Sequence, residues 1–264
     1  PELLDTLAVD LMDDGWSLKR LLKRIVLSRT YRQASRATAE ARSLDPDNRW
    51  LARGPRFRLT AEAIRDNALA IAGLVSLEKG GLSIRPPQPD GLWTKVGGEK
   101  YAYKVSPGEA QYRRGLYVVL KRGSPYPSFV TFDATARMTC LVKRPRSNTP
   151  LQALVLLNDT VFTEAAVHFA ARILSDLPDA SDEQRLEHAY QVAVARQPKS
   201  AERDVLLGLL AEERADIAAE PESVNELLAD HQDAVAKVAS PEELAAWYGV
   251  ATTLLNLDET ITKP

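Results

Sequence analysis

The stretch that decides the fold is "NTPLQALVLLNDTVFTEAAVHFAARILSD", residues 148–176. Thr149 can cap a helix, and Pro150 suits the first helical position. The apolar residues that follow predict a buried helix, which the residues 158–160 interrupt before a second, amphipathic helix begins. The side chains expected to be buried are Leu151, Leu154, Val155 and Leu157 in the first helix and Phe162, Ala165, Ala166, Phe169, Ile173 and Leu174 in the second.

The same pattern of caps and helical spacing recurs on both sides of this stretch. Ser17, Thr60 and Ser240 each precede an apolar sequence with helical spacing. We therefore predict a mainly α fold with a helical, bundle-like body made of residues 1–79 and 131–264. The whole chain, 1–264, is expected to be one domain fragment.

Residues 80–130 follow a different pattern. Glycine and proline become frequent there, and the helical period is lost. The apolar run 117–120 suits a buried strand, although a short helix is also compatible. We predict a small, β-containing and loop-rich insert laid over the helical body, and long loops of this kind are often functional.

Composition limits the class of protein. The chain has 264 residues, of which 45% are hydrophobic and 27% charged, as in an ordinary globular protein. Its apolar runs are too short to cross a bilayer, so no membrane span is predicted. Because the first residue is Pro1 rather than Met, we interpret the chain as a piece of a longer protein. The lack of a signal sequence in this piece therefore says nothing about export. The single cysteine, Cys140, excludes an internal disulfide and a Cys-x-x-Cys-His haem attachment within this piece.

The net charge of −2 hides an asymmetry along the chain. Residues 1–150 hold 26 Lys and Arg against 15 Asp and Glu, whereas residues 151–264 hold 8 against 21. The two parts can simply face each other or solvate different surfaces. Alternatively, the first part contains an anion-binding site.

Arginines before one predicted helix are the first candidates for such a site. Arg53, Arg56 and Arg58 lie within six residues and can form a fork for carboxylate, sulfate or phosphate. The alternative is that they pair with nearby aspartates and hold the loop. A second cationic stretch, with Lys143 and Arg144, comes just before Thr149.

Asp133 is the one acidic candidate for catalysis. Its plain role is to cap a short helix. Framed by Arg137, Lys143, Arg144 and Arg146, it could instead act as a general base or orient a water. The cations would lower its pKa, which suits an ionised carboxylate better than a general acid.

No familiar catalytic motif is present, whether a nucleophile elbow, a P-loop or a dinucleotide fingerprint. The three histidines, His168, His188 and His231, are too few and too scattered for a convincing zinc site, so they are expected to be structural and no metal is predicted. Cys140 is expected to be a buried, inert thiol.

Several ordered blocks together resemble a known family. They include "NRWLARGPRFRLTAEAIRD" (48–66), "PSFVTFDATAR" (127–137), "RPRSNTPLQALVLLND" (144–159) and "ELAAWYGVATTLLNLDETITK" (243–263). The chain resembles the C-terminal domain of unknown function 1553, the PSD family, of planctomycete cytochrome-C-associated proteins. The resemblance extends over nearly the whole chain.

This resemblance implies a larger, exported, multidomain parent. Its missing N-terminal part would carry haem c, whereas no cofactor is expected in this fragment. The family brings no accepted activity and no assigned catalytic residues. Similar blocks carry arginines that would line an electropositive pocket if they meet: Arg53, Arg56, Arg58, Arg113, Arg114, Arg144 and Arg146.

Two functional hypotheses follow. In the first, the chain is a scaffold or interaction domain of an exported protein, and its arginines tie loops together or dock an acidic partner. In the second, it is the substrate-binding part of an enzyme that acts on sulfated or uronic polysaccharide, with Asp133 or an upstream residue as the acid/base group. The missing N-terminal domains are expected partners, and nucleic acid is not. We favour the first hypothesis because no self-sufficient catalytic set is present.

Overall fold

The computed structural model describes residues 1–97 and 102–263. By internal contacts these form two compact units, Pro1–Phe57 with Thr262–Pro264 and Arg58–Ile261. This division does not test the prediction of one domain with an insert at 80–130, part of which (98–101) lies outside the described residues, so that statement stays a prediction.

The smaller unit holds the helices α1 (Glu2–Asp13), α2 (Leu18–Leu27) and α3 (Ala39–Leu44). Ser17 caps α2, as the sequence predicts, by accepting a hydrogen bond from the Arg20 amide. In α2 the apolar side chains Leu18, Leu22 and Val26 remain exposed. Among the described residues, none of these three helices has a buried side chain. This unit therefore has little apolar core of its own.

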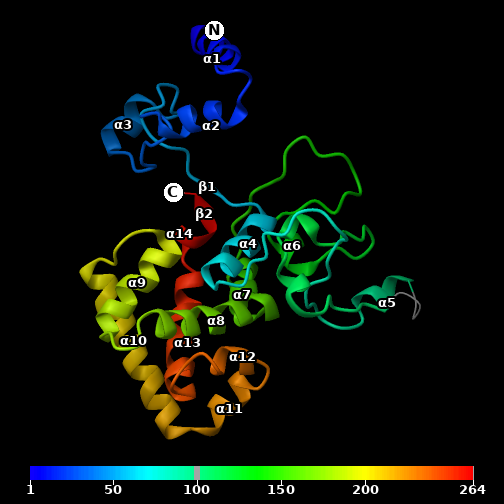
Figure 1. The fold of residues 1–264 in the computed structure, drawn as a ribbon, viewed down its shortest axis with the longest axis vertical. Helices are drawn as coiled ribbons and strands as arrows, with labels where there is room; N and C mark the ends of the chain where they lie inside the picture. Colours follow the sequence, from blue (N-terminus) through cyan, green and yellow to red (C-terminus); the bar gives the residue numbers. More distant parts are fainter. Residues whose placement is uncertain (98–101, 264) are drawn as a thin grey trace. The chain divides into compact units, whose positions relative to one another are not determined.

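The larger unit is built around two long helices. The helices α8 (Thr160–Asp176) and α13 (Pro241–Leu255) cross at its centre and share its most extensive packing (Figure 1). Small residues such as Ala170 and Ala246, both fully buried, let the two backbones approach closely. Trp247 is fully buried as well, and its Nε1 donates to Glu243.

Further helices surround this pair. Ser240 caps α13 and Asp159 caps α8, so both central helices begin at capping side chains. The surrounding helices are α4 (Ala61–Ile71), α7 (Pro150–Asn158), α9 (Asp182–Val194), α10 (Ser200–Ala219), α11 (Glu222–Leu228), α12 (Gln232–Val235) and α14 (Asp258–Ile261). The mainly α fold class is thereby confirmed.

The predicted insert contains short helical turns and isolated bridges. It holds α5 (Leu92–Gly97), two 3-10 turns (Gly108–Tyr112 and Gly115–Tyr117) and the start of α6 (Pro127–Thr131). For residues 117–120 the sequence allowed a buried strand or a short helix, and the strand is wrong. A 3-10 turn occupies the start of this run, and within it only Val118 forms a bridge, to Ile84. The two named strands, β1 (Phe57–Arg58) and β2 (Thr262–Lys263), pair with each other outside the insert.

One glycine explains how the insert packs on α4. A Cβ atom at Gly115 would come within 2.9 Å of the Cα and carbonyl oxygen of Glu62. The Gly115 amide also donates to the Asp66 carboxylate at 2.5 Å. Only a residue without a side chain fits this approach.

The buried face of α7 differs from the one predicted. Leu151 and Leu154 are 64% and 53% exposed, whereas Leu156 is 3% exposed and Gln152 is buried. Gln152 points inward because its Nε2 donates to the Thr131 carbonyl at 2.9 Å. That bond fixes the rotation of the helix and turns the expected leucine face to solvent. The prediction for α8 is confirmed, since its six expected core residues are all buried.

Candidate functional site

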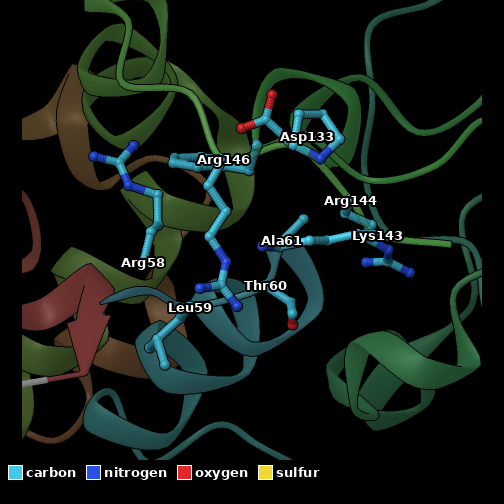
Figure 2. Close-up of a pocket in the computed structure, with 10 residues that line it drawn as sticks. Arg58, Leu59, Thr60, Ala61, Asp133, Lys143, Arg144 and Arg146 are labelled. Atoms are coloured by element: carbon cyan, nitrogen blue, oxygen red, sulfur yellow. The ribbon is translucent and has the colours of Figure 1, made fainter. Parts of the chain in front are cut away.

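A pocket of about 210 Å³ lies at the start of α4 in the larger unit (Figure 2). Its wall comes from three segments. These are residues 58–61 at the start of α4, residues 132–133 after α6, and residues 143–146, here called the cationic loop, which leads to α7. The lining residues are Arg58, Leu59, Thr60, Ala61, Phe132, Asp133, Lys143, Arg144, Pro145 and Arg146. Four cations and one carboxylate therefore surround it.

The helix start adds its own positive potential. Thr60 caps α4 by accepting a hydrogen bond from the Ala63 amide. Both Thr60 and Ala61 line the pocket, so the positive end of the helix dipole is directed at it. Figure 2 shows the Arg146 side chain reaching over this helix start toward Thr60.

Arg144 is already engaged by an acid. Its Nη1 lies 2.9 and 2.8 Å from the two carboxylate oxygens of Glu62, in the first turn of α4. These hydrogen bonds raise the pKa of Arg144. Burial opposes the charged form of Glu62, but Arg144, together with hydrogen bonds from the Glu62 amide and Thr60, outweighs it and leaves the pKa of Glu62 lowered. Arg144 thus ties the cationic loop to α4.

Arg58 is held by neutral partners. Its Nη2 donates to the Asn148 side-chain oxygen at 2.9 Å, and its Nη1 donates to Gln152. These amide oxygens carry no net charge, so they do not neutralise the positive charge of Arg58 beside the pocket. The inward rotation of α7 therefore also positions this arginine.

Asp133 is placed in the pocket wall, but both of its oxygens are occupied. Oδ2 accepts from the Ser147 amide at 2.7 Å, and the Ser147 hydroxyl lies 2.9 Å from each oxygen. Asp133 follows α6 and has a φ of 62°, so the expectation that it caps a following helix is wrong. Its observed role is to hold the cationic loop.

The remaining predicted arginines lie elsewhere. Arg53 and Arg56 line a separate pocket of about 520 Å³ within the smaller unit. Arg53 holds that loop through main-chain oxygens, with Nη1 2.9 Å from the Asp45 carbonyl and Nη2 2.7 Å from that of Pro46. This is the loop-holding alternative considered from the sequence, achieved through carbonyls instead of aspartates.

Arg113 and Arg114 belong to the insert. Arg113 is buried, stacks 3.9 Å from the centre of the Tyr117 ring, and donates to the carbonyls of Leu82 (2.7 Å) and Gly80. Arg114 hydrogen-bonds to the same tyrosine. The structure thus brings together three of the seven candidate arginines, Arg58, Arg144 and Arg146, around one pocket.

The expectation that Cys140 is buried is wrong, because this residue is exposed.

Arg65 is a buried residue that was missed from the sequence. It is 2% exposed and donates to the carbonyls of Arg113 (2.8 Å) and Gln111 (2.6 Å). Burial lowers its pKa. Helical spacing could have found it, because Arg65 lies one turn after the buried Ala61 and beside Ile64.

Comparison with known proteins identifies the family. The sequence model of PSD1, described as a protein of unknown function (DUF1553), matches residues 1–210. The chain belongs to this family, as its sequence blocks suggested. Neither a curated protein nor a solved structure gives a significant match.

Within residues 1–97 and 102–263, no single helix is long and apolar enough to cross a membrane. Taken together, α7 and α8 are long and apolar enough by length and composition, but they are bent by 59° where they meet.

Proposed function

We propose that this chain is a scaffold or interaction domain, C-terminal in a larger exported and cytochrome c-associated protein, and that its pocket docks an acidic group. The observation that carries the proposal is the pocket at the start of α4, where four cations meet one carboxylate that is already hydrogen-bonded. The partner class is an acidic surface of another domain or protein, and haem c would belong to the part of the parent that precedes this chain.

The way the arginines are used supports a scaffold. Arg53 and Arg113 hold loops through backbone carbonyls, and Arg144 joins a loop to α4 through Glu62. Such contacts stabilise one arrangement of loops. Two other cations of the pocket, Arg58 and Lys143, form no ion pair with an aspartate or glutamate among the described residues, so their charge remains available to an incoming anion.

The size of the pocket limits the ligand. About 210 Å³ is less than the roughly 300–1,000 Å³ typical of sites for drug-sized molecules. One carboxylate or sulfate with its neighbouring atoms fits this space better than several sugar rings. Arginine holds such planar or tetrahedral anions well through paired N–H groups.

The alternative, a substrate-binding part of an enzyme for anionic polysaccharide, stays a prediction. It needs a carboxylate free to take up a proton or orient a water. Asp133 uses both oxygens to hold Ser147, so no particular contact favours it as that group.

Binding to defined anions tests the proposal. We would titrate the purified chain with hexaglutamate and with a uronic-acid oligosaccharide by calorimetry at low and moderate salt. We expect hexaglutamate to bind, with an affinity that falls as salt rises because exposed charges are screened. Lys143→Ala and Arg146→Ala should each weaken binding.

Arg137→Ala is the matched control, since Arg137 is an exposed cation near the same loop that does not line the pocket. Absence of binding, or an equal loss in the Arg137 variant, would contradict the proposed pocket. Cleavage of the oligosaccharide, detected as new reducing ends, would instead establish the enzyme alternative.

A further inference from the structure

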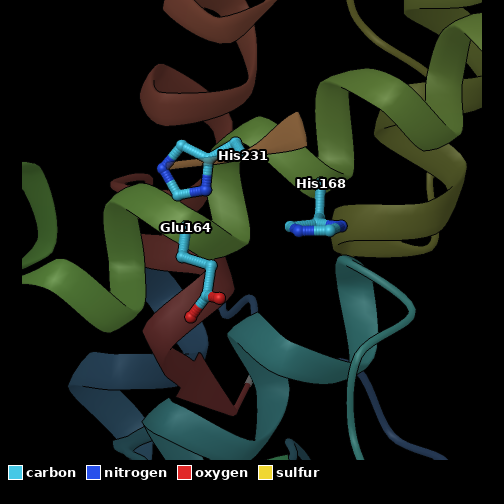
Figure 3. A group of neighbouring side chains, drawn as sticks. All are labelled: Glu164, His168 and His231. Atoms are coloured by element: carbon cyan, nitrogen blue, oxygen red, sulfur yellow. The ribbon is translucent and has the colours of Figure 1, made fainter. Parts of the chain in front are cut away.

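A second cluster of chemically capable side chains lies on α8 of the larger unit. Glu164 and His168 stand one turn apart on this helix, and His231 lies on the turn between α11 and α12 (Figure 3). One ligand atom from each residue lies within 4.8 Å of the others. These residues do not line the pocket at the start of α4.

The fold explains why they meet. Residues four apart on a helix share one face, which puts Glu164 and His168 together. The short helix α12 packs against α8, and His231 precedes it. The His231 amide donates to the Leu228 carbonyl at 3.0 Å, and its own carbonyl accepts from Ala234 at 3.0 Å. The turn is thereby fixed beside α8, with the rings of His168 and His231 centred 6.4 Å apart.

His168 is the decisive member of the cluster. Its side chain is 3% exposed, yet its Nε2 has no hydrogen-bond partner. Asp233 comes within 3.5 Å of this nitrogen without forming a hydrogen bond, and Asp233 itself is largely exposed. A buried polar atom without a partner costs free energy. One ring nitrogen of His168 also lies within 4.8 Å of a carboxylate oxygen of Glu164 and of a ring nitrogen of His231.

The carboxylate is also oriented from behind. The Tyr112 hydroxyl donates to Glu164 Oε1 at 2.6 Å. Metal-binding carboxylates are commonly held by such a bond, which sets their direction and basicity. Glu164 retains a second oxygen with which to bind.

We propose that Glu164, His168 and His231 form a binding site for one divalent transition-metal ion, of which Zn²⁺ is the best representative. Two imidazoles and one carboxylate are a known zinc-binding set that leaves one coordination position open. Ligand atoms bound tetrahedrally at about 2.1 Å lie roughly 3.4 Å apart. A small inward movement of the side chains would achieve this. The inference replaces the sequence-based expectation that these histidines are only structural.

The site also has a specific relation to the family. Glu164 and His168 lie within the residues 1–210 that match the family, whereas His231 lies beyond them. The third ligand therefore comes from the part of the chain that the family description does not cover. Sequence comparison restricted to the matched region would show only the pair on α8.

Metal titration tests the site. The chain, stripped with a chelator, is titrated with ZnCl₂ by calorimetry, and its thermal unfolding is followed with and without Zn²⁺. We expect one bound ion, a higher Tm with Zn²⁺, and no comparable binding of Mg²⁺, which prefers oxygen ligands. Co²⁺ should give the visible spectrum of a tetrahedral site with nitrogen ligands.

Three variants make the result specific. Glu164→Gln keeps an oxygen that can accept from Tyr112 but removes the charge, and His231→Gln removes a half-buried imidazole. Each should weaken Zn²⁺ binding by at least about tenfold, because even the partners behind metal ligands contribute 10–100-fold. His188→Gln is the control, since His188 is not a member of the cluster and its Nε2 lies 3.0 Å from Asp176. This variant should bind Zn²⁺ like the unchanged chain.

Circular dichroism confirms that each variant is folded before its affinity is compared. The proposal is overturned if the unchanged chain binds no Zn²⁺ or Co²⁺, or if folded Glu164→Gln and His231→Gln chains bind Zn²⁺ undiminished. Loss of binding in His188→Gln alone would likewise overturn it, because the ion would then lie at the His188–Asp176 pair.

Discussion

Arg65 shows how a single residue can join the insert to the helical body. Its guanidinium is buried and donates to two carbonyls of the segment around the first 3-10 turn, Gln111 and Arg113. Burial lowers the pKa of this guanidinium, and the nearby carboxylates of Asp66, Asp159 and Glu164 oppose that shift. Without Arg65 those carbonyls would be buried without partners.

We therefore expect Arg65→Met to destabilise the protein. Methionine fills much of the volume but leaves two carbonyls without a donor, at a cost of about 2–4 kcal/mol in the free energy of unfolding. Urea unfolding followed by circular dichroism measures it. Arg137→Met, which replaces an exposed arginine, should change this free energy by less than about 0.5 kcal/mol. Equal effects of the two substitutions would refute the assigned role.

Glu202 gives a pH dependence at the residue scale. Hydrogen bonds from Arg196, at 2.7 and 2.9 Å, lower the pKa of Glu202 from 4.5 to about 2. Since the folded pKa is below the unfolded one, this contribution to stability is present above about pH 4.5 and is lost as the pH falls toward 2. We expect Glu202→Gln to flatten the acid side of the curve of unfolding free energy against pH. A series of urea titrations between pH 6 and 2.5 measures this, and an unchanged slope would contradict it.

At the scale of the elements, α7 is the instructive case. Its start was predictable, because Thr149 and Pro150 form a capping sequence and the observed capping box also uses Gln152. Its buried face was not predictable, because almost every position after Pro150 is apolar. In such a run the spacing of apolar residues does not show which side of the helix faces the core. Gln152, the polar residue within the apolar run, looks solvent-facing in sequence but is buried by bonds to distant partners, Thr131 and Arg58.

Two substitutions on α7 test this orientation. Leu154→Gln should leave the free energy of unfolding within about 0.5 kcal/mol of the original, because Leu154 is half exposed. Leu156→Ala should cost about 2–5 kcal/mol, because it removes buried methyl groups from the core. Thermal or urea unfolding distinguishes them, and a larger loss for Leu154→Gln would restore the face that the sequence suggested.

The candidate sites show the same limit of local patterns. The cationic loop was visible in the sequence because its charges are close neighbours, and three of the candidate arginines do share a pocket. Contacts such as that between His168 and His231 depend on where α12 folds back onto α8, which no local spacing encodes. Arg113 likewise resembles a surface cation in sequence and is buried in the structure.

At the scale of the whole molecule, the buried apolar residues are unevenly distributed. Among the described residues, every buried hydrophobic side chain lies between Ala61 and Ile261, in the larger unit. The helices α1, α2 and α3 of the smaller unit contribute none. Local stability follows the number of buried contacts, so the two units should differ in it.

Hydrogen exchange of backbone amides tests this expectation. Under native conditions the amides of α1 and α2 should exchange orders of magnitude faster than those of α8 and α13, because little buried surface opposes their local opening. Mass spectrometry of peptic peptides provides the measurement, with the partly buried helix α10 as an internal reference of intermediate rate. Equal protection of α1 and α8 would show that the smaller unit is stabilised in a way its burial does not reveal.

The pairing of α8 with α13 has a consequence for biosynthesis. A ribosome must add every residue between Asp176 and Pro241 after completing one helix and before starting its mate. At roughly 5–20 residues per second, the nascent chain carries an unmatched, alanine- and phenylalanine-rich segment for on the order of several seconds. Yield in a cell should consequently depend on chaperones that shelter that segment until translation delivers its counterpart.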